Sequence, residues 1–320
     1  MTAADIRRNL ILIVVVMIGL FLLQFVMPQY YVLTVTRMMV LAVFAVGYNM
    51  LLGYVGLLSL GHAMFFAAGL YGAGLATYHL GIAVPLAFVI GIAAALVLAF
   101  VIGWLALPTM RVSFMIVTLM FSQVGFLTTL YFAAYTGGQD GLSLPQAARH
   151  FDLFGADFSL ANDAVRFNVA FLLLAAALAV SFAVLVSRRG RIFTAIRENE
   201  GRTEMLGFNT FAAKLEAFLY SGGIAGAAGA AYGLLFGYMG STFASIQYSI
   251  EVLLFTLLGG AGTLLGPLVG VALMMTLIDQ LSEITSAYLL VIGVVLIALV
   301  LWFPKGILGS IRERWLPWLM

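Results

Sequence analysis

The chain has no cysteine and very little charge. None of its 320 residues is a cysteine, which excludes disulfides and thiol chemistry and says nothing about the compartment. Only 9% of the residues are charged, whereas a soluble domain carries roughly 25%. A chain so poor in charge does not cover a water-facing surface. Together with the 64% hydrophobic content, this predicts that the protein lies in a lipid bilayer.

Patterns for catalysis and for nucleotide binding are also missing. The lysines are Lys214 and Lys305, and neither completes a G-x-x-x-x-G-K-[ST] loop, so we expect no ATP hydrolysis by that machinery here. The three histidines have no metal-ligand spacing, so no metal site is predicted. Ser59 and His62 lie three apart on what reads as one helix face, without a nearby acid or oxyanion motif. We therefore predict no catalytic residue.

Long apolar runs are what the chain does have. A membrane-spanning helix needs about 20 apolar residues. The run after Arg7 and Arg8 is long and has no small-residue cleavage pattern behind it, so we expect a retained span rather than a signal peptide. The sequence predicts an all-α, polytopic membrane protein with a single domain over 1–320 and about ten segments: 9–27, 32–52, 57–79, 83–106, 112–132, 165–187, 215–238, 248–260, 265–281 and 285–303.

Basic residues in short loops predict the orientation, because they favour the cytoplasmic side. Arg7 and Arg8 place the N-terminus inside. Loop 133–164 has one basic residue against four acids, and we expect it outside, either as a structured cap or as a solvated linker. Loop 188–214 and the tail 304–320 are basic and are expected inside. Because the basic residues lie beside apolar runs, topology explains them better than nucleic acid does.

An interruption in the C-terminal third predicts a discontinuous helix pair. The run 248–281 is broken by GGAGTLLGP at 259–267. About 13 residues precede the break and reach only about 20 Å, which is short for a span. We predict that this pair enters the membrane and returns, with broken backbone buried in protein or lining a cavity. A plain kinked helix is the alternative.

Glycine and polar residues gather at two places among the apolar runs. A polar group in the bilayer needs a partner or a wet cavity, so these residues either line a translocation path or helix crossing, or only form interhelix hydrogen bonds. Glu251 is either a buried coupling charge or, as we favour, a solvated acid at a helix start, and Arg37 is expected to snorkel. The candidate path residues are Asn49, Gly53, Gly56, Ser59, Gly61, His62, Gly259, Gly260 and Gly262.

The polar stretch 188–214 holds six of the fifteen basic residues. Within it, 194–206 is predicted to be a helix, with Thr194 as its cap and Gly207 as its end. Ile192 and Ile196 share one face. Close-set charges of both signs favour a surface that docks a soluble protein, and an interfacial membrane anchor is the alternative.

Three blocks resemble the permeases of branched-chain amino-acid ABC transporters, in their M-type form. They are GYNMLLGYVGLLSLGHAMFFAAGLYGAG (47–74), GRIFTAIRENEGRTEMLGFNTFAAKLEAFLYSGGIAGAAGAAYG (190–233) and GGAGTLLGPLVGVAL (259–273). The resemblance implies an ABC importer permease fold in a bacterial inner membrane. It also implies a paralogous permease subunit, two ATPase subunits that hold ATP and Mg, and a periplasmic binding protein, with no cofactor on this chain.

The resemblance further implies that the polar helix contacts the ATPases. Only Glu204 and Gly207 fit the EAA…G pattern of the wider importer class. Related permeases for urea, short-chain amides or aromatic acids look alike at this level. An ion-coupled secondary transporter would instead need intramembrane acids, for which Glu251 is the candidate. The expected coupling residues are Ala195, Ile196, Arg197, Glu198, Glu200, Glu204 and Gly207.

Overall fold

The computed structural model describes residues 3–109, 111–153, 156–285, 287–303, 305–316 and 318–319. The long and short α-helices are α1 (Ala3–Val26), α2 (Gln29–Asn49), α3 (Ala63–Leu80), α4 (Val84–Ala106), α5 (Arg111–Tyr131), α6 (Ala133–Thr136), α7 (Asp163–Val186), α8 (Arg188–Met205), α9 (Thr210–Phe236), α10 (Ile246–Gly259), α11 (Gly266–Ile284), α12 (Tyr288–Trp302) and α13 (Ile307–Arg314). A π-helix, Met50–Val55, extends α2, and 3₁₀ turns lie at Gln146–Arg149 and Ser241–Ala244. The strands are β1 (Leu142–Ser143), β2 (His150–Leu153), β3 (Ala156–Ser159) and β4 (Tyr238–Met239).

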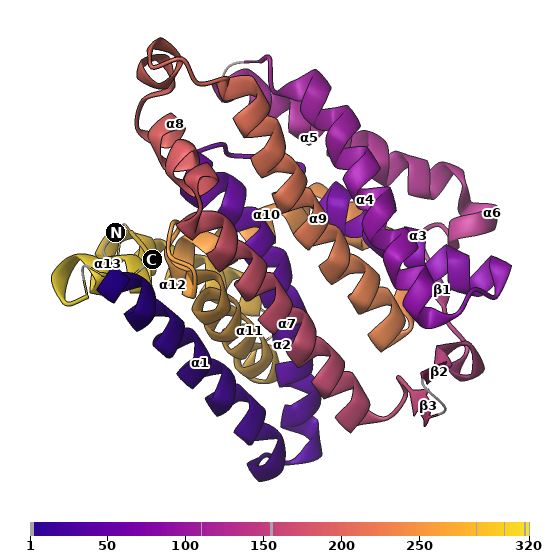
Figure 1. Ribbon diagram of the computed structural model, residues 1–320. Coiled ribbons are helices and arrows are strands. Elements are labelled where there is room, and N and C mark those ends of the chain that lie inside the picture. The colour runs from indigo at the N-terminus through magenta and orange to yellow at the C-terminus, as the bar shows by residue number, and fades with distance from the viewer. Residues whose placement is uncertain are drawn as a thin grey trace.

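The helices form a bundle with two distinct ends (Figure 1). The α8 end carries α8, α13 and both chain ends, where Asn9 Nδ2 donates to the carbonyl of Trp318 at 2.7 Å. The strand end carries α6 and the strands. The N-terminus, loop 188–214 and tail therefore share one end, opposite to loop 133–164, as the loop charges predict. Which end faces the cytoplasm stays a prediction.

The all-α, multi-span architecture predicted from the apolar runs is confirmed. By length and composition, seven helices within the described residues are suited to cross a membrane, and 246–259 and 290–299 form shorter apolar helices. With α3, these helices coincide with the ten predicted segments. One boundary was wrong: the segment predicted at 57–79 begins as a helix only at Ala63, because residues 56–62 are not helical.

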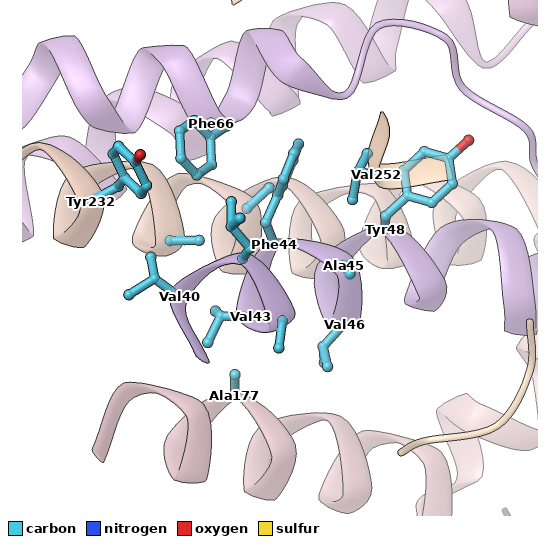
Figure 2. Packing of buried hydrophobic residues seen from close by; sticks show 14 of the residues in the cluster. Val40, Val43, Phe44, Ala45, Val46, Tyr48, Phe66, Ala177, Tyr232 and Val252 are labelled. Carbon is cyan, nitrogen blue, oxygen red and sulfur yellow. The ribbon is translucent and has the colours of Figure 1, made fainter. Parts of the chain in front are cut away.

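The centre of the bundle is α2, which is enclosed by α7, α9, α10 and α11. Every residue from Met39 to Asn49 is buried. Figure 2 shows Phe44 facing Phe66 of α3 on one side and Val43 facing Ala177 of α7 on the other. The Phe44 and Phe66 ring centroids are 4.8 Å apart. No position along this half of α2 contacts lipid. Its apolar and small residues therefore lie on every side of the helix rather than along one face.

Close contact of α9 with α3 explains why α9 is rich in small residues. A Cβ atom on Gly229 would lie 1.9 Å from the Phe66 carbonyl oxygen. A larger residue there would force the helices apart. In lipid, small residues allow the backbones to approach and to gain dispersion contacts.

The predicted discontinuous pair is present, and it reverses direction. The 14 residues of α10 end at Gly259, and α11 begins at Gly266. A Cβ on Gly270 would lie 1.8 Å from the Phe255 carbonyl oxygen, so the two helices pack antiparallel over their first turns from the break. The kinked-helix alternative is therefore wrong. The other end of α10 starts inside the bundle, where Ser249 Oγ accepts a 2.9 Å hydrogen bond from the Ala63 amide.

Loop 133–164 is structured where it is described. Strand β2 pairs with β3, and β1 pairs with β4, which follows α9. Arg149 is buried, and its Nη1 donates to the Leu235 carbonyl at 3.4 Å. These contacts attach the loop to the end of α9, so the cap alternative fits the fold better than the solvated linker.

Candidate functional site

Helix α8 runs along the end of the bundle between two membrane helices (Figure 1). It begins two residues after α7 ends, with Ser187 Oγ accepting from the Arg189 amide as its N-cap. Thr194 was therefore wrongly predicted as the cap; its hydroxyl donates to Gly190 within the helix. Asn199 has non-helical φ and ψ, so α8 is bent into two parts rather than a single rod from 194 to 206. Gly207, with φ of +86°, ends it as predicted.

The apolar face of α8 packs on protein. Phe193 and Ile196 are buried against Val55 of the π-helix and Ala213 and Ala217 of α9. An interfacial anchor would direct such a face toward lipid. The internal packing therefore favours a helix fixed to the bundle with its polar face outward.

Hydrogen bonds connect α8 to two breaks in the membrane helices. One break is the π-helix after α2, and the other is the α10–α11 connection. Arg197 donates from its Nη1 to the Gly53 carbonyl in the π-helix. Asn49 bridges the π-helix and the α10–α11 connection, because its Nδ2 donates to the Thr263 carbonyl and its Oδ1 accepts from the Gly262 amide, both at 2.9 Å. We call these five residues, Asn49, Gly53, Arg197, Gly262 and Thr263, the junction. Its hydrogen bonds satisfy backbone groups that the broken helices leave unpaired.

The junction leaves no room for side chains at its glycines. A Cβ on Gly53 would lie 2.1 Å from Asn49 Oδ1 and 2.5 Å from the Gly262 amide nitrogen. Gly262 has φ of +82°, and a Cβ there would lie 2.8 Å from Arg197 Nη1. Gly56, with φ of +81°, ends the π-helix against the Arg197 side chain. The glycines predicted as a helix crossing are therefore brought together with the polar residues of the junction.

Helix α13 covers the same connection from outside. Arg312 Nη1 donates to the Gly262 carbonyl at 3.0 Å. Gly260, with φ of +119°, faces the Gly309 backbone of α13, and Gly259 contacts Gly266 where α11 begins. A cavity of about 660 Å³ opens beside these residues and is lined in part by Leu52, Arg197, Ala261, Thr263 and Arg312.

Ser59, Gly61 and His62 lie deeper, in the non-helical connection before α3. The expectation that Ser59 and His62 share a helix face was wrong. His62 is fully buried, and its Nε2 lies 3.1 Å from Ser221 Oγ, which donates to the Gly47 carbonyl at 2.6 Å. Ser59 accepts through its carbonyl from the Tyr48 hydroxyl, and Gly61 abuts α5. All three residues are buried, and their contacts hold together the non-helical connection before α3.

The remaining predicted coupling residues lie on the outer side of α8. Glu198 and Ala195 line a groove of about 380 Å³ beside Arg312. Glu200 pairs with Lys214 at 2.5 Å, and Glu204 accepts from the Thr210 hydroxyl at 2.7 Å. The latter two contacts fix the second part of α8 to the start of α9.

Glu251 does not occupy the solvated helix start that we favoured. It lies in the second turn of α10, whose start is inside the bundle, and its side chain is partly buried. Arg37 is exposed on α2.

Comparison with known proteins identifies the family of this chain. A family model described as the permease component of branched-chain amino acid transport systems matches residues 30–300. The chain belongs to this family. The match covers the junction and both breaks and leaves α1 outside it. The protein is a multi-pass membrane permease, as the apolar helices also indicate.

Individual relatives agree with the family. The permease is 28% identical to the high-affinity branched-chain amino acid transport system permease protein LivM of Salmonella typhimurium over 87% of this chain and 70% of that protein. It has the same identity and coverage with LivM of Escherichia coli K12. It is 27% identical to LivH of Escherichia coli K12 over 84% of this chain and 91% of that protein. No solved structure matches.

Reasoning from the sequence missed an apolar tip on the permease. Met205 and Leu206, at the end of α8, are 88% and 75% exposed, and Phe208 is 46% exposed. We call these three residues the α8 tip. The signal was present in the sequence, since apolar residues flank the helix-ending Gly207, but the prediction gave weight only to charge.

Proposed function

We propose that this permease is the membrane-spanning subunit of an ATP-driven importer of branched-chain or other hydrophobic amino acids in a bacterial inner membrane. A paralogous permease pairs with it, two ATPase subunits dock at the α8 end, and a periplasmic binding protein delivers substrate at the strand end. ATP and Mg bind the ATPases, and this chain translocates without covalent chemistry. Its similarity to both LivM and LivH supports the pairing of two related permeases.

One observation carries the proposal: α8 is exposed on its outer side and is attached by Arg197 to the π-helix that continues the central helix. Displacement of α8 by a docked protein would move the Gly53 carbonyl, and through Asn49 the α10–α11 connection. The π-helix and the α10–α11 connection would then shift together. Alternating access requires that nucleotide favours one arrangement of these helices over the other.

The α8 tip supplies the anchor of the proposed docking surface. Methionine and aromatic side chains are enriched at protein–protein interfaces relative to the rest of the surface. Glu198 and Arg202, which are exposed on the same helix, provide charges that fix the register of the partner.

The test compares Met205→Glu with Leu80→Glu. Leu80 is also an exposed apolar residue, 72% against 88% for Met205, and it lies at the strand end. We expect Met205→Glu to abolish co-purification of the ATPase subunits and ATP-driven leucine uptake, while its insertion stays normal. Leu80→Glu should retain both. Normal uptake by the Met205→Glu complex would contradict the docking surface.

A second measurement separates the rival transport classes. Purified permease alone, reconstituted in proteoliposomes with ion gradients, should take up no leucine. Ion-driven uptake without ATPase would identify a secondary transporter instead. Competition by urea, acetamide and benzoate against leucine in the complete system would decide among the related substrate classes.

A further inference from the structure

The cavity of about 660 Å³ beside the junction lies between the π-helix, α8, α10 and the segment that contains α13. Figure 1 shows α13 at the same end of the bundle as α8. The two ends of the cavity wall are joined by close packing, because a Cβ on Gly306 would lie 2.4 Å from the Leu257 carbonyl oxygen. The hydrogen bonds of the junction do not fill this space, so it can admit a ligand.

The polar wall of the cavity is cationic. Its described lining residues include three cations and one acid: Arg197, Lys305, Arg312 and Glu313. The neighbouring groove contains Glu198 together with Arg191, so it does not neutralise the excess of positive charge. A concave surface with charges of one sign concentrates ligands of the opposite sign. This cavity therefore favours an anion.

Two of the cations are fixed at the same point. Arg312 Nη1 donates to the Gly262 carbonyl at 3.0 Å, and a Cβ on Gly262 would lie 2.8 Å from Arg197 Nη1. Arg197 itself donates to the Gly53 carbonyl. A guanidinium group has five N–H donors, and each of these contacts uses a single nitrogen. Both groups are thus held in position and keep donors for a bound anion.

The third cation is attached less firmly. Lys305 Nζ lies 2.6 Å from Glu313 Oε1, and both side chains are exposed. Exposed ion pairs contribute little to stability. Lys305 can therefore turn from Glu313 toward an anion in the cavity at little cost.

The other wall of the cavity is apolar and reaches the surface of the bundle. Leu52 of the π-helix, Leu257 near the end of α10 and Phe303 just after α12 line it. Leu257 and Phe303 are exposed. A small soluble anion gains nothing from such a wall, whereas an anion with hydrocarbon chains would cover it. Cations beside exposed apolar side chains thus fit an anionic amphiphile.

The position of the cavity along the membrane helices agrees with this ligand. Trp302, where α12 ends, and Trp315, which follows α13, are exposed on either side of Lys305 in the sequence. Tryptophan is enriched where a membrane protein crosses the interface between lipid and water. The cations therefore lie near the level of the lipid headgroups, and basic pockets between membrane helices bind such headgroups.

We propose that this cavity binds one anionic phospholipid from the bilayer leaflet at the α8 end. Arg197, Lys305 and Arg312 donate to its phosphate, and its acyl chains lie against Leu257 and Phe303. Because both arginines also bind backbone carbonyls at the two helix breaks, the bound lipid holds α8 and α13 against the α10–α11 connection.

The test measures lipid binding to the full-length permease in a neutral detergent by native mass spectrometry. The probes are phosphatidylglycerol and phosphatidylcholine with identical acyl chains. We expect phosphatidylglycerol to bind roughly 5-fold more tightly or better, the factor that one basic residue contributes at an anionic lipid surface. It should also raise the unfolding temperature more than phosphatidylcholine does, because a ligand of the folded state stabilises that state. Equal binding of the two lipids would overturn the proposal.

Three variants of exposed side chains assign the binding to the cavity. Lys305→Gln should weaken phosphatidylglycerol binding roughly 5-fold. Arg314→Gln removes an exposed cation of α13 that is not among the lining residues, and it should change binding by less than about 2-fold, because a distant exposed charge is largely screened. Glu313→Gln removes the acid and should tighten binding. If Lys305→Gln and Glu313→Gln weaken binding equally, their ion pair is only structural and the site is wrong.

Two other occupants would give different results. Displacement of phosphatidylglycerol by an equal concentration of inorganic phosphate would identify a site for a soluble anion and overturn the lipid. Displacement by the ATPase subunits in the complete importer would assign the cavity to the docking surface and overturn it as well. None of these measurements requires transport, so their outcome is independent of the proposed function.

Discussion

At the scale of single residues, the junction shows why glycine and asparagine interrupt apolar helices here. Asn49 provides one donor and one acceptor to backbone groups of the α10–α11 connection. An amide side chain is suited to this because it carries both functions. The polar residues were recognisable in the sequence as groups that need partners. Their partners were not, because Thr263 lies 214 residues away from Asn49, and spacing along one chain does not reveal which breaks meet.

Gly53→Ala is the sharpest test of the junction's packing. The added methyl would lie 2.1 Å from Asn49 Oδ1, and overpacking of this kind costs about 1–3 kcal/mol. We expect a lower thermal unfolding temperature in detergent, with reduced uptake. Gly125→Ala is the control, since its nearest neighbour would be Met64 Cβ at 3.8 Å. Equal unfolding temperatures for the two variants would contradict the tight approach.

At the scale of elements, α8 has two parts that are held differently: the part before Asn199 is packed into the bundle, and the part after it follows the bend. Residues before Asn199 are held by Phe193 and Ile196 in the protein interior. After the bend, Asn199 Oδ1 accepts from the Arg202 amide and so caps the second part. The sequence predicted the helix and its end at Gly207 correctly, since a glycine stop is a local signal. It did not predict the earlier start at Arg188 or the bend, because both depend on packing against α7 and α9.

Asn199→Ala should loosen the second part of α8 alone. Loss of an N-cap costs about 0.5–2 kcal/mol. We expect faster amide hydrogen exchange over 200–205 and unchanged exchange over 188–198. Arg202→Ala removes an exposed side chain while keeping the capped amide, so it serves as the comparison. Uniform acceleration along the whole helix would show that α8 behaves as one rod.

At the scale of the whole molecule, the two ends of the bundle are chemically distinct. The α8 end collects Arg197, Arg312 and the two chain ends, and the strand end carries the structured cap. The number of membrane segments and the relative placement of the loops could be predicted, because apolar length and loop charge are local properties. The reversal of α10 and α11 could be predicted only in outline, and the inner start of α10 was not predicted, because both depend on contacts among distant helices.

Because the chain has no cysteine, single introduced cysteines give an unambiguous test of orientation. Arg202→Cys should react with a membrane-impermeant maleimide only in inside-out vesicles. Tyr135→Cys, which replaces a residue 63% exposed at the strand end, should react only in right-side-out cells. Both should react after solubilisation. Labelling of the two positions from the same side would refute the arrangement of the ends.

The hydrogen-bond partners of Asn49 are synthesised much later than Asn49 itself, and this has a consequence for biogenesis. The ribosome makes this residue 213 to 214 positions before Gly262 and Thr263. At about 5–20 residues per second, the nascent central helix waits roughly 10 to 40 s for the segment that completes it. During that interval its amide must be shielded by the insertion machinery or by water rather than by its final neighbours.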